Sequence, residues 1–256
     1  MNIEDLVGNT PIVEIKSNIF AKLETFNLSG SIKDRIVLYI LNNAEKKGLI
    51  NENTVLVEAT SGNTGIALAM LGSIKKYKVK IIMPSNMSAE RKQLMRLYGA
   101  EIIEVGHNDF PGAIALRDKL VRENDNWWSL NQFENPLNIE CHEKTTAREI
   151  IRQVFIDRKL EPEVLICGAG TGGTIMGVGR ALKRINKDIR IIQVKPAEDA
   201  LNHGIQGIGD GGDYLVNPDF IDEVVYIKTA DAIAKATEMS ANGLLVGISA
   251  GANVLA

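Results

Sequence analysis

Short runs of β-branched residues alternate with amphipathic helical patterns along most of this 256-residue chain. Within residues 34–47, for example, apolar side chains recur at the three- and four-residue spacing of a helix face. This alternation is typical of parallel sheets covered by helices on both sides, so the sequence predicts an α/β fold. In such sheets, ligands bind at the carboxyl ends of the strands.

The apolar runs place the individual elements. The expected strands are Thr54–Ala59, Val79–Met83, Glu101–Val105, Trp127–Leu130, Val164–Cys167, Ile189–Val194 and Glu223–Ile227. The expected helices are Asp34–Lys47, Ser88–Tyr98, Pro111–Glu123, Glu140–Phe155, Thr174–Ile185 and Asp231–Ala241. The polar stretch Asn131–Asn138 separates two strand–helix series, so we expect it to cross between two domains.

Composition and charge exclude several function classes. Hydrophobic residues make up 45% of the chain and charged residues 24%, which predicts a folded globular protein. The formal net charge of -3, without any block rich in Lys or Arg, argues against a nucleic-acid partner. Residues 1–8 do not resemble a signal peptide, and no apolar run approaches the ~20 residues of a membrane span. We therefore expect no membrane partner and a cytoplasmic location.

The potential metal ligands are scattered. Cys141 and Cys167 show neither metal-ligand spacing nor a disulfide framework, which predicts two free thiols. His107, His142 and His203 form no set, so we expect surface or capping roles for them. The sequence predicts no metal site.

A glycine-rich loop, Cys167–Thr174, follows a predicted strand and opens a predicted helix. Glycines let backbone N–H groups converge on an anion, and the helix N-terminus adds partial positive charge. The hydroxyls of Thr171 and Thr174 are further donors, so the loop predicts a phosphate site; a tight turn without a ligand is the alternative. The loop also satisfies GxGxxG, but Lys195 stands where a dinucleotide site needs an acidic residue. The loop therefore favours a single phosphate over a dinucleotide, which argues against a nicotinamide-dependent oxidoreductase.

Two other loops complete a pattern. The loop Thr60–Gly65 offers hydroxyls and backbone donors at a helix start, which suits a carboxylate; a simple helix cap is the alternative. In Ser29–Arg35, Lys33 lies at a glycine-bearing turn into a helix, and a deprotonated lysine can form a Schiff base. A covalent anchor, a phosphate site and a carboxylate site together are what a pyridoxal-phosphate enzyme needs for an amino-acid substrate.

These loops belong to a longer series of motifs that runs from the first ten residues to the last. The series includes GNTP, AKLE, SGSIKDR, VEATSGNTGIALAM, MPSNMSAER, YGAE, QFENP, KTT, GAGTGGTIMGVGR, GIQGIG and GLLVGISAGA. With them the chain resembles the cysteine synthases (O-acetylserine sulfhydrylases), the B branch most closely, and the cystathionine β-synthases. The resemblance implies the pyridoxal-phosphate fold type II, which has two doubly wound parallel-sheet domains like the tryptophan synthase β subunit.

The resemblance also implies the domains and the residue roles. Residues 36–135 would form a smaller mobile domain, and residues 1–35 plus 136–256 the larger cofactor-binding domain. Lys33 matches the lysine that binds the cofactor covalently and moves the substrate's α-proton, and Asn63 matches the residue at the cofactor's 3′ oxygen. The matching substrate-carboxylate residues are Thr60, Ser61, Gly62, Thr64 and Gln132. The matching phosphate residues are Gly170, Thr171, Gly172, Gly173 and Thr174, and Gly207 lines the cofactor's other side.

The implied reaction is ping-pong β-substitution, in which acetate leaves Cβ of O-acetylserine and sulfide replaces it to give cysteine. The partners are then a small amino acid and sulfide or a thiol, and relatives are commonly homodimers. A partner-binding protein that has lost catalysis is a further alternative.

Three departures from the family pattern keep other reactions open. Asp210 stands where the family usually has alanine. As a catalytic general base it would favour a lyase that consumes cysteine and releases hydrogen sulfide, or formation of a thioether; a turn aspartate is the alternative. The loop after Val194 is short, and the family's serine at the pyridine nitrogen has no counterpart before the chain stops at Ala256, so we expect a short C-terminal end.

Overall fold

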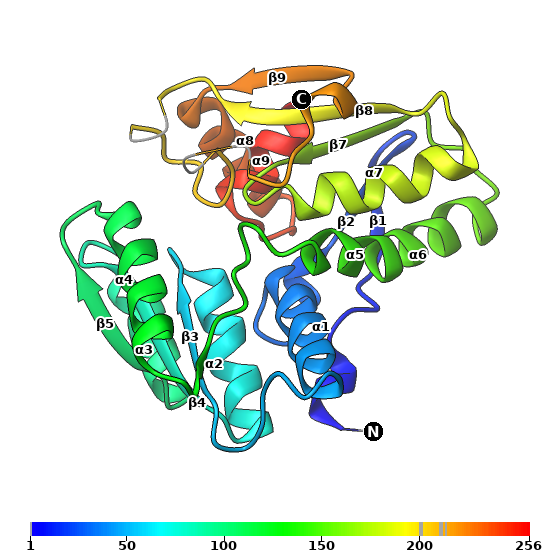
Figure 1. The fold of residues 1–256 in the computed structure, drawn as a ribbon. Helices are drawn as coiled ribbons and strands as arrows, with labels where there is room; N and C mark the ends of the chain where they lie inside the picture. Colours follow the sequence, from blue (N-terminus) through cyan, green and yellow to red (C-terminus); the bar gives the residue numbers. More distant parts are fainter. Residues whose placement is uncertain (1, 200–201, 210–211, 213) are drawn as a thin grey trace. The chain divides into compact units, whose positions relative to one another are not determined.

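The computed structural model describes residues 2–199, 202–209, 212 and 214–256. These residues fall into two compact units, Met1–Asn131 and Gln132–Ala256, coloured blue to green and green to red in Figure 1. The boundary lies at the start of the predicted crossing, 131–138. The assignment of residues 1–35 to the second domain stays a prediction.

The first unit contains a parallel sheet with strands in the order β5-β4-β3-β6. Its strands are β3 (Val55–Ala59), β4 (Lys78–Pro84), β5 (Glu101–Val105) and β6 (Trp127–Trp128), and its helices are α2 (Asn63–Lys75), α3 (Ala89–Leu97) and α4 (Phe110–Glu123). Every residue of β3 is buried, as expected for a parallel strand covered on both faces. The strand order reverses between β3 and β6, so the ligand-binding crevice of such a sheet falls at the carboxyl end of β3.

The N-terminal part of this unit was only partly predicted. Before helix α1 (Lys33–Lys46), the chain forms an antiparallel hairpin of β1 (Ile12–Lys16) and β2 (Ile19–Lys22) that the alternation of longer elements did not reveal. Asn18 makes the turn with a positive φ of 61°, which asparagine tolerates better than most residues. Short 3-10 turns lie at Ile3–Leu6 and Glu24–Phe26.

The second unit contains the parallel sheet β7-β8-β9, formed by β7 (Val164–Gly168), β8 (Arg190–Pro196) and β9 (Glu223–Ile227). Its helices include α7 (Gly173–Ile185), α8 (Thr229–Ala241) and α9 (Ile248–Leu255). Ile191 packs in a cluster with residues of α7, whereas Val194 packs with Ala232 of α8 and Ala252 of α9. Because side chains alternate along a strand, positions 191 and 194 point to opposite faces, so helices cover both faces of this sheet as predicted.

One predicted helix is divided. Residues 140–155 were expected to form one helix, but the chain forms α5 (Leu137–Lys144), α6 (Thr146–Ile150) and a π-helical segment, Ile151–Ile156. The break is at Thr145, whose hydroxyl donates to the carbonyl of Cys141 at 2.8 Å and whose φ and ψ are −120° and −77°. A side-chain bond of this kind competes with regular helix geometry.

Among the described residues, no helix is long and apolar enough to cross a membrane.

Candidate active site

The predicted substrate loop lies at the carboxyl end of β3, next to the switch point of the first sheet. Its hydroxyls are built into the fold: Thr60 is 2% exposed, and its Oγ1 accepts a hydrogen bond from the Gly62 N–H at 3.1 Å. Helix α2 then begins at Asn63, so the first N–H groups of that helix face the same end of the sheet. An N-terminus with buried threonines on both sides of Gly62 suits an anionic carboxylate.

The loop before Lys33 is closed by side chains from the first turn of α1. Asp34 is fully buried and accepts hydrogen bonds from both the backbone N–H of Ser29, at 2.6 Å, and the Ser29 hydroxyl. Burial raises the pKa of the Asp34 carboxyl, and the hydrogen bonds from Ser29 oppose this rise. Ser31 Oγ accepts from the Lys33 N–H at 3.3 Å. Hydrogen bonds thus connect the residues before Lys33 to Lys33 and Asp34 in the first turn of the helix.

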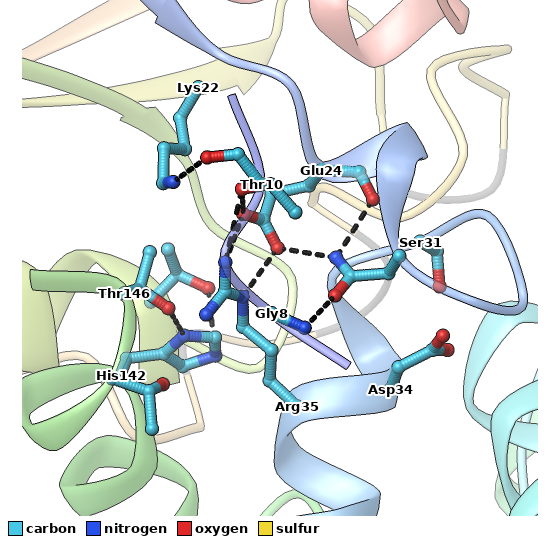
Figure 2. Close-up of polar contacts among 12 residues, drawn as sticks. Gly8, Thr10, Lys22, Glu24, Ser31, Asp34, Arg35, His142 and Thr146 are labelled. Carbon is cyan, nitrogen blue, oxygen red and sulfur yellow. Dashed lines mark hydrogen bonds and ion pairs between the residues drawn. The ribbon is translucent and has the colours of Figure 1, made fainter. Parts of the chain in front are cut away.

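Arg35 fixes the same helix turn from the other side (Figure 2). Its guanidinium donates to both carboxylate oxygens of Glu24, at 2.7 and 2.8 Å, and to Thr10 Oγ1 at 3.1 Å. Asn27 donates to Glu24 at 2.7 Å and accepts from the Gly8 N–H at 2.8 Å. Three motifs of the sequence, GNTP, AKLE and SGSIKDR, therefore meet in one partly buried network that supports the turn bearing Lys33.

The predicted phosphate loop joins β7 to α7, and its glycines are required by close backbone approach. A Cβ on Gly170 would lie 2.4 Å from the carbonyl oxygen of Gly207, and one on Gly173 would lie 1.9 Å from Asn138 Oδ1. Gly172 has a φ of +91°, which side chains rarely adopt. The N-terminus of α7, the loop backbone and Gly207 therefore pack closely into one glycine-lined turn.

Two side chains outside the predicted set support this loop. Asn138 donates to Thr171 Oγ1 at 3.0 Å. His142 is 1% exposed, and its ring nitrogens contact Thr146 Oγ1 at 2.9 Å and Thr174 Oγ1 at 3.1 Å. The expectation of a surface or capping role is therefore wrong for His142. The only sequence signal was the four-residue spacing between His142 and Thr146, which places both on one helical face.

The remaining predicted residues are distributed as follows. Gln132 is buried, and its backbone carbonyl oxygen accepts a hydrogen bond from Asn138 Nδ2 at 2.9 Å. Gly207 has a φ of +92°. Asp210 lies outside the described residues. The structure thus brings together Thr60, Ser61, Gly62, Asn63 and Thr64 in the first unit, and Gly170 to Thr174 with Gly207 in the second.

Residues 3–256 match the family described as pyridoxal-phosphate dependent enzyme, and the chain belongs to this family. It is 40% identical over 266 residues to cysteine synthase B of Campylobacter jejuni, which covers 99% of this chain and 88% of the relative. A hydrogen sulfide-producing enzyme from Fusobacterium nucleatum matches with a TM-score of 0.91 and 39% identity, covering 100% of this chain and 90% of that one. A cysteine synthase from Entamoeba histolytica matches with a TM-score of 0.91 and 39% identity, covering 99% and 80%.

These matches confirm the predicted fold class and cofactor. Pyridoxal phosphate carries an anionic phosphate, and the glycine-lined turn fits that group because its backbone leads into the N-terminus of a 13-residue helix, where free N–H groups carry partial positive charge. No acidic side chain occurs between Gly168 and Thr174 to repel the anion. Among the described residues, no group of His, Cys, Asp and Glu side chains could hold a metal ion.

Proposed function

We propose that this protein makes cysteine from O-acetylserine and sulfide by substitution at Cβ. The observation that carries the proposal is the match to cysteine synthases over nearly the whole chain, with 40% identity to cysteine synthase B of Campylobacter jejuni. The structure supports it with an anion-binding turn for a phosphate and a second, hydroxyl-rich helix start for a carboxylate.

Each predicted residue has a task in this reaction. Bound pyridoxal phosphate supplies an electron sink that lets a proton leave Cα and a group leave Cβ of the amino acid. Lys33 holds the cofactor, and its Nζ then takes and returns the α-proton. Asn63 would bind the cofactor's 3′ oxygen, Gly207 would line the cofactor, and the turn from Gly170 to Thr174 would bind its phosphate. The substrate carboxylate is bound by Thr60, Ser61, Gly62, Thr64 and Gln132.

The finer features of the proposal concern the assembly and the domains. We place the protein in the cytoplasm as a homodimer whose residues 36–135 form the smaller, mobile domain. Closure of that domain over the substrate carboxylate would exclude water, which would otherwise compete with sulfide for Cβ.

The second candidate is a cysteine-consuming lyase that releases hydrogen sulfide. It is favoured by the similarity to the hydrogen sulfide-producing enzyme of Fusobacterium nucleatum. In this case Asp210 acts as the general base for water or a thiol.

A visible absorption spectrum of the purified holoenzyme separates these candidates. For a cysteine synthase, O-acetylserine changes the cofactor band, and sulfide restores it with the formation of cysteine. For the lyase, O-acetylserine leaves the band unchanged, and cysteine releases hydrogen sulfide.

Lys33→Ala is the variant that tests the mechanism. Turnover should fall about a thousandfold, because both the covalent anchor and the proton carrier are lost. Lys47→Ala, at an exposed lysine after the same helix, is the matched control and should leave turnover unchanged. Retained activity in Lys33→Ala would rule out the mechanism.

A further inference from the structure

The ladder between β3 and β6 stops after two residue pairs, of which Leu56 and Trp128 form the second. Two residues further along β3, Glu58 is 0% exposed. Its Oε2 accepts hydrogen bonds from the Ser129 hydroxyl at 3.1 Å and the Asn131 N–H at 3.0 Å. A side-chain carboxylate therefore continues the pairing between the two segments where the backbone ladder has ended.

A third element, α4, reaches the same carboxylate. Arg117 Nη1 lies 3.1 Å from Glu58 Oε1, and this guanidinium also donates to Asp118 at 2.7 and 2.9 Å. Burial raises the pKa of the Glu58 carboxyl, and the Arg117 charge and the hydrogen bonds from Ser129 and Ala59 oppose that rise. Every donor around Glu58 matches its ionised form.

The position of Glu58 gives this cluster its significance. The carboxylate also accepts from the Ala59 N–H at 3.1 Å, and Thr60 follows directly as the first residue of the substrate loop. On the other side, Asn131 has a positive φ of 49° and immediately precedes Gln132 in the chain. One carboxylate is thus bonded to the last residues before two predicted parts of the substrate-carboxylate site.

Stability alone does not account for the ion pair. Replacing a buried ion pair with apolar residues of similar volume is often neutral or stabilising, whereas such pairs can hold segments in one arrangement. Here the segments are the loop after β3 and residues 129–131 after β6. They lie on either side of the sheet's switch point, where a ligand is expected.

We propose that Glu58, paired with Arg117, is a positioning residue for the amino-acid substrate, setting the spacing between the loop after β3 and the segment Ser129–Asn131. It does not touch the substrate. Its effect appears in substrate affinity, because misplaced donors bind the carboxylate less well. This proposal rests on the proposed function of the loop as a substrate-carboxylate site.

The main test replaces both members of the pair, Glu58→Gln with Arg117→Met, in the holoenzyme. The double substitution avoids leaving one buried charge without its partner. The probe is L-alanine, which has the amine and carboxylate of the substrate but no leaving group at Cβ. The dissociation constant for L-alanine, from the cofactor band, and the KM for O-acetylserine should both rise about tenfold, the loss expected for one charge-assisted hydrogen bond. The kcat should change less than about twofold, because the reacting groups stay in place.

A second variant keeps the charges in place. Ser129→Ala removes one donor to Glu58 and should weaken L-alanine binding about threefold, whereas Ser129→Thr keeps the hydroxyl and should restore it. Glu101→Gln, in the exposed pair with Lys80 of the same sheet, is the control and should leave both constants unchanged.

The outcomes separate this proposal from the proposed function. A wild-type protein that shows no response of its cofactor band to amino acids would sink both. A wild-type protein that responds, together with variants that melt at lower temperature but bind L-alanine as tightly, would overturn the positioning role alone. Weaker binding in both Glu58 and Ser129 variants, with kcat nearly constant, supports it.

Discussion

The loop after β7 and the loop after β3 both join a parallel strand to a helix, yet they are shaped by different contacts. At Gly170, a Cβ would meet the backbone oxygen of Gly207 at 2.4 Å, so the close approach involves two main chains. At Gly62, the nearest atoms that a Cβ would meet belong to the side chain of Arg91, with Cδ at 2.9 Å. The φ of Gly62 is 167°, an extended value open to any residue.

This difference matches the two ligands that the loops are proposed to bind. A cofactor that stays in place suits a turn whose shape is fixed by backbone packing. A substrate that enters and leaves suits a loop whose neighbour is a flexible side chain, here one that also donates to the Ser61 carbonyl at 3.3 Å. Glycine thus fixes the phosphate turn, whereas hydrogen bonds fix the substrate loop.

Among the substitutions that compare the two loops, the largest effect is expected from Gly170→Ala. The added Cβ forces Gly170 or Gly207 to move, so the affinity for pyridoxal phosphate should fall about a hundredfold, in line with the cost of overpacking. Titration of the cofactor-free protein with pyridoxal phosphate, followed by absorbance, measures this loss. Gly247→Ala in the same unit is the control, because its nearest atom beyond the chain neighbours is 4.0 Å away. Equal affinities for the two variants would contradict a backbone-fixed turn.

A smaller effect is expected from Gly62→Ala. Arg91 can move aside, so cofactor affinity should stay unchanged while the KM for O-acetylserine rises about fivefold. In an Arg91→Ala background the space is already open, and the same substitution should then change KM by less than about twofold. Additive effects of the two substitutions would show that the loop is strained by its backbone, like the phosphate turn, and would remove the contrast.

Much of this fold could be predicted from sequence because its strands are buried on both faces and appear as short apolar runs. All predicted strands form, although the one expected at 127–130 is limited to Trp127–Trp128. The hairpin β1–β2 and helix α9 were not predicted. In β1, Glu14 interrupts the apolar run, and the glycines and alanines of α9 give little periodic signal.

The two loops could also be predicted, because glycine and hydroxyl residues at a strand–helix junction are a local signal. Their supports could not. Glu58 contacts Ser129 across 71 positions, and His142 contacts Thr174 across 32. Periodicity describes neighbours within one element, so partners this distant become visible only when the sheets are assembled.

The smallest expected effect tests whether the two sheets also differ in how folding shifts the pKa of a carboxyl group in each. In the second sheet, Asp222 accepts from the Ile191 N–H at 2.7 Å, and this bond is the main reason that the pKa of Asp222 lies below its ordinary value. A carboxyl whose pKa is lowered on folding stabilises the fold above its ordinary value of 3.8, and this contribution is lost as the pH falls through the lower folded pKa.

Asp222→Asn should therefore lower the free energy of unfolding by about 1 kcal/mol or less at neutral pH, since solvent screens this exposed group, and by nothing in strong acid. The pKa of Glu58 is raised by burial, so its carboxyl has the opposite pH dependence: its contribution is greatest below the ordinary value of 4.5 and declines as the pH rises through the folded pKa. Urea unfolding across the acid range, comparing wild type with Asp222→Asn and with the Glu58–Arg117 double variant, measures both trends. If the stability difference from wild type changed with pH in the same direction for both variants, the two carboxylates would be held alike, and the contrast between the sheets would then be confined to their loops.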